Sequence, residues 1–195
     1  MPAPPTIRTE RLLLRPFARA DAEAVSELAG AFEIADTTIS VPHPYSLQLA
    51  IDWIMGHERG RRRGRAFRFA ITEAASGRLN GCVELRDLDQ EHSQAELGFW
   101  VGKPFWRLGY ASEAASAVVQ FGFESLGLNR IYAYHMARNP ASGKVLQKLG
   151  MRREGILRQR VRKWERFEDV EAYAVLRSDV VSTYNIALPF ESTEP

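Results

Sequence analysis

Cysteine is almost absent from this chain of 195 residues, whose single thiol is Cys82. A lone thiol can form neither an internal disulfide nor a zinc site with several cysteine ligands, and this scarcity fits a reducing compartment. No apolar stretch approaches the roughly 20 residues that span a bilayer, so no membrane contact is expected. The start, Met1–Pro5, lacks the charged and then apolar pattern of a secretory signal. We therefore expect a cytoplasmic protein.

An excess of charge of one sign is also lacking. The formal net charge is +2, with 26 Lys and Arg against 24 Asp and Glu, so the overall balance indicates no particular partner. The run Arg61–Arg65 could contact nucleic acid or form a solvated loop, and the absence of interleaved aromatic residues favours the loop. His43, His57 and His92 show no metal-ligand spacing. Neither a nucleic-acid partner nor a metal is expected.

Alternating strand-like and helix-like segments occupy most of the chain. The predicted strands cover residues 9–17, 66–74, 79–88, 93–101, 128–136, 151–157 and 170–176. The predicted helices follow the N-cap Asp21 up to Gly30, follow Ser46 over 47–59, and cover 112–126 and 141–149. No linker divides these segments. They predict one mixed α/β domain over residues 6–182, with loosely ordered ends at 1–5 and 183–195.

The turn between the predicted strand 93–101 and the helix that follows carries the clearest chemical signal. Gly109 allows a tight bend, and the small Ala111 leaves room for a bulky anion. Backbone N–H groups at a helix start, together with the helix dipole, favour negative charge. The glycine spacing fits neither a P-loop nor a dinucleotide fingerprint. A diphosphate is therefore the expected guest, and an ordinary tight turn is the alternative.

A second constellation, Asn139-Pro140-Ala141-Ser142, follows the next predicted strand. Asparagine caps helices, and proline suits the first helical position. If the strands 93–101 and 128–136 lie side by side in parallel, both helix starts meet at the carboxyl edge of the sheet, where open α/β sheets bind ligands. The Ser142 hydroxyl would then face that edge. The alternative for Asn139 is a capping role alone.

Three motifs in this order resemble the GNAT superfamily of N-acetyltransferases: Ala95–Val101, Trp106–Ala114 and Asn139–Met151. The opening Thr9–Arg15 is typical of the branch that contains the ribosomal-protein alanine and serine N-terminal acetyltransferases. The resemblance extends from about residue 6 to 180. It implies a GNAT-like fold, with a mixed, mostly antiparallel twisted sheet, a central parallel strand pair and flanking helices.

The same resemblance implies an acetyl-CoA-dependent N-acetyltransferase that acts on a primary amine. The acceptor would be either a protein N-terminus or a small molecule such as a polyamine, an amino acid or an antibiotic. A CoA-binding protein without catalysis is the alternative from another class. Dimers are common among GNAT enzymes, so the resemblance also implies a homodimer.

The resemblance further implies a role for each matching residue. Backbone amides of the turn would hold the pyrophosphate of acetyl-CoA, namely those of Arg107, Leu108, Gly109, Tyr110, Ala111 and Ser112. Phe99, Trp100 and Val101 would pair with the pantetheine arm as an added strand, and one amide there could polarise the thioester carbonyl. Asn139 and Ser142 would face the pantetheine and the sulfur. Lys144 or Lys148 could meet the ribose 3′-phosphate.

Acetyl transfer requires the acceptor amine to lose a proton. An unperturbed α-amino group has a pKa of about 8, so a modest base suffices. Glu96 is the first candidate and Glu84 the second; for Glu96, pairing with a nearby arginine is the alternative role. Many GNAT enzymes carry a tyrosine seven residues after the asparagine, where this chain has Leu146. The resemblance therefore shifts the leaving-group role to Ser142.

Overall fold

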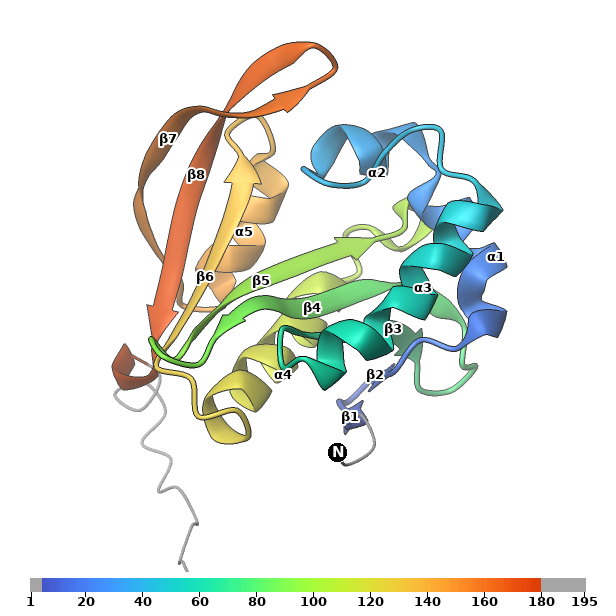
Figure 1. The fold of residues 1–195 in the computed structure, drawn as a ribbon, viewed down its shortest axis with the longest axis horizontal. Helices are drawn as coiled ribbons and strands as arrows, with labels where there is room; N and C mark the ends of the chain where they lie inside the picture. The colour runs from blue at the N-terminus through green and yellow to red at the C-terminus, as the bar shows by residue number, and fades with distance from the viewer. Residues whose placement is uncertain (1–4, 180–195) are drawn as a thin grey trace, which may run out of the picture.

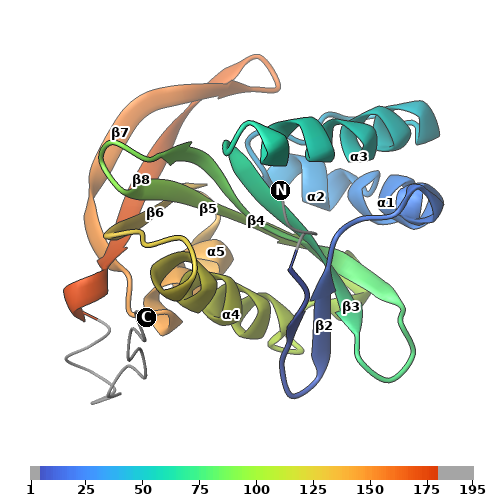
Figure 2. The same ribbon diagram turned by 60° about the horizontal axis from the view of Figure 1, so that its bottom comes forward.

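The computed structural model describes residues 5–179 of the chain. Within them, the strands form one eight-stranded sheet in the order β1-β2-β3-β4-β5-β6-β8-β7 (Figure 1). One face of the sheet is covered by α1 (Ala22–Ala29), α2 (Phe32–Thr37) and α3 (Leu47–Arg62), as Figure 2 shows. The other face is covered by α4 (Tyr110–Glu124) and α5 (Pro140–Lys148). The ends expected to be loosely ordered, 1–5 and 183–195, lie outside the described residues apart from Pro5.

The sheet is mixed. Its strands are β1 (Ile7–Arg8), β2 (Leu12–Arg15), β3 (Ala66–Glu73), β4 (Leu79–Asp89), β5 (Gln94–Val101), β6 (Arg130–Met136), β7 (Arg152–Lys163) and β8 (Arg166–Leu176). Between residues 5 and 179, every neighbouring pair is antiparallel except β5 and β6, which are parallel. The predicted mostly antiparallel sheet with a central parallel pair is confirmed.

The two parallel strands separate after a short contact. Their pairing runs from Gln94↔Arg130 to Glu96↔Tyr132. β5 then continues along β4, and β6 continues along β8, so the two strands diverge (Figure 1). In the described part of the chain, residues 97–101 of β5 therefore have a strand partner on one edge alone. Their other edge has backbone groups open to an added strand.

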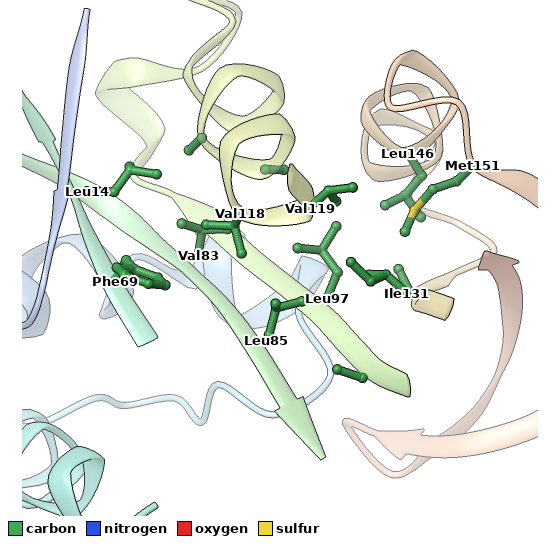
Figure 3. Close-up of a cluster of buried hydrophobic side chains, with 14 of the residues drawn as sticks. Leu14, Phe69, Val83, Leu85, Leu97, Val118, Val119, Ile131, Leu146 and Met151 are labelled. Carbon is green, nitrogen blue, oxygen red and sulfur yellow. The ribbon is translucent and has the colours of Figure 1, made fainter. Parts of the chain in front are cut away.

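The main hydrophobic core lies between the sheet and the helices α4 and α5 (Figure 3). It joins sheet residues to helix residues, among them Leu14, Phe69, Val83, Leu85, Leu97, Val118, Val119, Ile131 and Leu146. A second cluster on the opposite face includes Val25 of α1 and Ala50 and Ile54 of α3. Each large side chain buried in this way contributes roughly 1.5–3 kcal/mol. Helices on both faces thus hold the diverging strands in place.

The start of α1 differs from the sequence expectation. The Asp21 side chain makes no capping hydrogen bond to the helix. Its carboxylate accepts two hydrogen bonds from Arg15, at 2.7 and 2.8 Å, and one from the Ala18 amide at 2.7 Å. A bidentate guanidinium is a strong partner for a carboxylate. The predicted side-chain N-cap is therefore wrong, although the helix does begin after Asp21.

Three other segments also differ. The pattern misses α2 altogether. The arginine run was expected as a loop or frayed end, but α3 continues through Arg61 and Arg62, because arginine is a good helix former and suits a helix C-terminus. The hairpin of β7 and β8 is longer than the predicted strands 151–157 and 170–176. No helix within residues 5–179 is long and apolar enough to cross a membrane.

Candidate active site

The turn that follows β5 is built around Gly109, whose φ is +83°. Such a left-handed conformation is easy for glycine and costs other residues roughly 1–2 kcal/mol. Gly109 is the N-cap of α4, which begins at Tyr110 rather than at the predicted Ser112. The N–H groups of Tyr110, Ala111 and Ser112 therefore fall in the first helical turn, where they have no intrahelical acceptor. This is the geometry of an anion site at the predicted position.

Thr9 and Arg11, just before β2, hold this turn in place. Glu113 in the first turn of α4 accepts hydrogen bonds from Thr9 Oγ1 at 2.6 Å and from the Arg11 amide at 2.9 Å. Arg11 also donates through Nε to Glu113 at 2.7 Å and through Nη1 to the Leu108 carbonyl at 2.9 Å. Burial acts to raise the pKa of Glu113, but these hydrogen bonds outweigh it and lower that pKa. The Thr9–Arg15 motif thus has a physical role that the sequence alone did not reveal.

The start of α5 is organised by Asn139. Its Oδ1 accepts from the Ser142 amide at 3.4 Å, as a capping residue does. Its Nδ2 donates to Ser142 Oγ at 3.0 Å and to the Thr37 carbonyl at 3.1 Å. Because the Ser142 oxygen already accepts this bond, its hydroxyl proton can point elsewhere. Asn139 is therefore a helix cap that also orients Ser142.

A cavity of about 170 Å³ lies where β5 and β6 diverge. Side chains along a strand alternate between the two faces of a sheet. Glu96 and Tyr134 face the side of α3, whereas Leu97 and His135 face the side of α5. All four line the cavity together with Ser142. The cavity is thus lined from both faces of the sheet, and it brings together Glu96 and Ser142.

A chain of charged groups crosses the α3 side of the cavity. Glu96 is 8% exposed, and its Oε1 accepts a hydrogen bond from Arg86. Arg86 also lies 3.5 Å from Glu84, which in turn accepts from Arg68 at 2.5 Å. Burial acts to lower the pKa of Arg86, but the hydrogen bond and charge of Glu96 raise it overall. Glu96 therefore has the arginine partner that its alternative role predicts. It also lines the cavity, as a general base must.

The loop and helix around residues 32–46 meet the tip of the β7–β8 hairpin, which Figure 1 shows reaching toward α2. Trp164 donates to Asp36 at 2.8 Å, and Arg138 donates to Asp36 at 2.9 Å. Lys163 donates to the Val41 carbonyl at 2.7 Å. We call Asp36, Arg138, Lys163 and Trp164 the clasp. Through Asp36 and Val41 it holds the segment 37–42, which lines the cavity, against the hairpin tip.

Some residues at the cavity have no role in the sequence analysis. Tyr45 and Tyr134 line it, and so does Arg86. For Arg86 a signal was available, because it lies two residues after Glu84 on a strand and so shares its face. Tyr45 comes from the segment between α2 and α3, where no pattern pointed to the sheet. Lys144 is exposed on α5, and it lies outside the cavity lining.

Comparison with known proteins identifies this arrangement. A family model for the acetyltransferase (GNAT) domain matches residues 11–152. The uncharacterised N-acetyltransferase YoaA of Bacillus subtilis strain 168 is 32% identical over 173 residues, which cover 89% of this chain and 97% of YoaA.

Two solved structures with a similar fold contain coenzyme A. The ribosomal α-N-protein acetyltransferase RimL, in complex with coenzyme A, has a TM-score of 0.81 at 18% identity, covering 88% of this chain and 98% of RimL. The spermidine N-acetyltransferase of Vibrio cholerae, in complex with CoA and spermine, has a TM-score of 0.77 at 22% identity, covering 89% and 99%.

The two solved structures show that the chain has the fold of the GNAT acetyltransferases. The family match over residues 11–152 and the relation to YoaA show that the chain belongs to the GNAT acetyltransferase family. The protein is an acetyl-CoA-dependent N-acetyltransferase, and its acceptor is an amine.

Proposed function

We propose that the protein transfers the acetyl group of acetyl-CoA to the α-amino group of a polypeptide N-terminus. The observation that carries this proposal is the cavity between the diverging strands, which has Glu96 toward one face of the sheet and Ser142 toward the other. This separation suits an amine that attacks from one side and a sulfur that leaves on the other, with a proton-transfer group near each.

Glu96 is a better candidate for the base than Glu84. Both oxygens of Glu84 have arginine neighbours, Arg68 at 2.5 Å and Arg86 at 3.5 Å. Arg86 hydrogen-bonds Oε1 of Glu96, and within residues 5–179 no hydrogen bond to Oε2 is found. Oε2 is therefore available to the acceptor ammonium, while the Arg86 contact fixes the orientation of the carboxylate.

The reaction follows from these positions. The acceptor nitrogen gives a proton to Glu96, and its lone pair then forms the new N–C bond to the acetyl carbon. As the C–S bond breaks, the sulfur keeps the electron pair and takes the hydroxyl proton of Ser142, and Ser142 regains a proton that comes ultimately from solvent. The nitrogen loses its second proton through Glu96 to solvent, so each turnover releases one proton overall. A backbone N–H of Phe99, Trp100 or Val101 polarises the acetyl carbonyl.

Acetyl-CoA fits the groups that remain open to a ligand at the start of α4, at the edge of β5 and at the start of α5. The proposed pyrophosphate ligands are the backbone N–H groups of Arg107–Ser112, at the start of α4. The proposed partner of the pantetheine arm is the open edge of β5, and Asn139 and Ser142 face its sulfur end. Trp106 Nε1 donates to the Val101 carbonyl at 2.6 Å, so that carbonyl already has a partner. Lys144 is the proposed contact of the 3′-phosphate.

The charge balance at the cavity favours a peptide end over a polyamine. Glu84 and Glu96 are matched by Arg68 and Arg86. These pairs offer no surplus carboxylate for a second ammonium group. A polypeptide N-terminus brings one positive charge, followed by neutral backbone. RimL and the spermidine acetyltransferase share the fold although their acceptors differ, so the fold does not decide between these classes.

Thiol release from acetyl-CoA tests the acceptor class. The panel consists of peptides with free N-termini, the same peptides with blocked N-termini, polyamines and amino acids. We expect the highest kcat/KM for the free peptides and none above background for their blocked counterparts. A clear preference for polyamines or amino acids would reject the polypeptide acceptor.

Replacing the proposed base gives a separate test. Glu96→Gln keeps the shape of the side chain, and we expect kcat to fall by about 10²–10³-fold, as the loss of a general base does. The Kd for acetyl-CoA should not change. Glu84→Gln is the matched control, and it should lower kcat far less. Equal turnover of Glu96→Gln and the wild type would remove Glu96 as the base.

A further inference from the structure

His135 on β6 has a buried ring nitrogen without a partner. The side chain is 5% exposed and lines the cavity together with Ser142 and Leu146. Its Nε2 makes no hydrogen bond within residues 5–179. A buried polar nitrogen without a partner costs roughly 1–3 kcal/mol. The nitrogen without a partner therefore argues against a purely structural histidine.

The other ring nitrogen fixes where the proton lies. Nδ1 of His135 is 2.9 Å from the Met136 carbonyl oxygen. A carbonyl oxygen can only accept, so Nδ1 must carry the proton and donate it. In the neutral ring, Nε2 therefore holds the lone pair. The nitrogen without a partner is the one that can take up a proton.

Glu171 on β8 is positioned to stabilise that proton. Its Oε2 is 3.8 Å from Nε2 of His135, which is too long for a hydrogen bond but close enough for charge attraction. The same oxygen accepts from Arg153 at 2.9 Å and from the Tyr173 hydroxyl at 3.2 Å. The hydrogen bond from Arg153 is the main reason that the pKa of Glu171 lies below its ordinary value. The carboxylate is therefore charged at neutral pH.

The ring lies directly beneath the first turn of α5. A Cβ added to Gly143 would be 2.9 Å from Nε2 of His135, so the helix can approach the ring only because residue 143 is glycine. Ser142 is the residue just before Gly143 in this turn. Leu146, one turn further, is 1% exposed and carries no proton to donate. On the α5 side of the cavity, the strand thus supplies the titratable group that the helix lacks.

We infer that His135 is a proton relay behind Ser142 on the leaving-sulfur side of the cavity. The inference rests on the proposed role of Ser142. When the C–S bond breaks, the sulfur takes the Ser142 proton, and Ser142 takes a proton from Nε2 of His135 through one bridging water. The imidazole becomes neutral and regains its proton from solvent before the next turnover. His135 acts through Ser142, so it is a positioning residue rather than a catalytic one.

The groups around the ring define the expected pH dependence. β8 presents Glu171 and Tyr173 to the ring. Arg153 of β7 does not contact the ring but donates a hydrogen bond to Glu171. α5 presents Gly143 and Leu146, and neither titrates. The relay must be protonated to act, so kcat should have a descending limb at high pH that depends on His135. The base Glu96 must be deprotonated, so it governs the rising limb at lower pH instead.

His135→Asn separates the relay from the structural contact. The asparagine amide can replace Nδ1 as the donor to the Met136 carbonyl, but it has no atom that titrates. We expect kcat to fall on the order of 10²-fold with the Kd for acetyl-CoA and the melting temperature unchanged. The descending limb of the pH profile should disappear. A variant that keeps both kcat and this limb would overturn the inference.

Glu171→Gln provides a second variant that should fold whatever the outcome of the first. Removing the negative charge disfavours the protonated ring, so the descending limb should move to lower pH without a change in acetyl-CoA binding. An unmoved limb would show that His135 does not titrate in the reaction. Both variants are assayed with whichever amine the wild type acetylates best. A non-peptide acceptor would therefore refute the proposed acceptor but not the relay.

A titration of the bound CoA thiol tests the relay without any acceptor amine. In the complex with CoA, the ultraviolet absorbance of the thiolate reports ionisation of the bound thiol. A protonated His135 behind Ser142 stabilises the thiolate, so His135→Asn should shift ionisation of the bound thiol to higher pH. Identical titrations of the wild type and the variant would contradict the relay.

Discussion

The proposed donor side of the cavity and its proposed acceptor side are assembled differently. On the donor side, several contacts join close neighbours in sequence, such as Asn139 with Ser142 and Trp106 with Val101. The clasp on the acceptor side joins Arg138 to Asp36 across 102 positions and Trp164 to Asp36 across 128 positions. The donor side is thus encoded mostly in short motifs, whereas the acceptor side depends on the packing of distant segments.

The two regions therefore have different roles. Backbone N–H groups at a helix start bind an anion whatever side chains surround them, so the donor side needs small residues and a correct turn. The long-range supports of the donor turn include the contacts of Thr9 and Arg11 with Glu113 and that of Arg11 with Leu108. The clasp consists of side chains, and we propose that it shapes the acceptor entrance. Mutations in the two regions should therefore change different kinetic constants.

Gly109→Ala on the donor side should give the largest difference between the change in the Kd for CoA and the change in the acceptor KM. An alanine at φ +83° is strained, and its Cβ would be 3.3 Å from Arg11. If relief of this strain costs about 1.4 kcal/mol of donor binding, the Kd for CoA rises about tenfold. The acceptor KM should stay the same. Isothermal titration with CoA and steady-state kinetics measure the two constants.

Gly127→Ala is the matched control for this variant. Gly127 has φ +68°, and an added Cβ meets nothing within 4 Å. The backbone strain is similar, so the melting temperature should fall by a similar amount in both variants. The Kd for CoA should rise for Gly109→Ala alone. An equal rise in both would show that the turn affects donor binding only through general stability.

The sequence could predict the two turns of the proposed donor side because their signals are local. Gly109, Asn139 and Ser142 each act within a few residues of their own position, and the strands around them were also found. The clasp could not be predicted in this way. α2 has only six residues, Phe32–Thr37, which is too short for a clear helical period. Its contacts with Arg138 and Trp164 come from segments far away in the chain.

The hairpin tip was missed for a related reason. Lys163 pairs with Arg166, so Trp164 and Glu165 form a two-residue loop, with φ of +49° and +63°. Such a loop usually contains Asn-Gly or a similar pair, which accepts positive φ easily. A Trp-Glu pair gives no turn signal. The packing of Trp164 against α2, stacked on Phe32 at 5.6 Å between ring centroids, helps to stabilise a turn that its own residues do not favour.

Trp164→Ala should have a smaller effect than Gly109→Ala, and it should change the acceptor KM rather than the Kd for CoA. It removes the hydrogen bond to Asp36 and the stacking on Phe32, and a net loss of about 1 kcal/mol would raise the acceptor KM roughly fivefold. The Kd for CoA should not change. The matched variant is Trp106→Ala, because Trp106 and Trp164 are 40% and 39% exposed. Trp106 contacts Val101 on the donor side, so its loss should raise the Kd for CoA instead. If both variants change the same constant, the division into two regions fails.

The smallest effect is expected from the pH response of the clasp. The hydrogen bond from Arg138 is the main cause that lowers the pKa of Asp36, and Trp164 acts in the same direction. Because the folded pKa lies below the unfolded value of about 3.9, the ionised Asp36 stabilises the clasp fully above that value. This contribution is lost as the pH falls through the folded pKa.

The fluorescence difference between the wild type and Trp164→Phe should therefore show a transition below about pH 4. Asp36→Asn should abolish this transition, and the Kd for CoA should show no transition in that range that depends on Asp36. A transition that persists in Asp36→Asn would place the pH response elsewhere and remove Asp36 as the centre of the clasp.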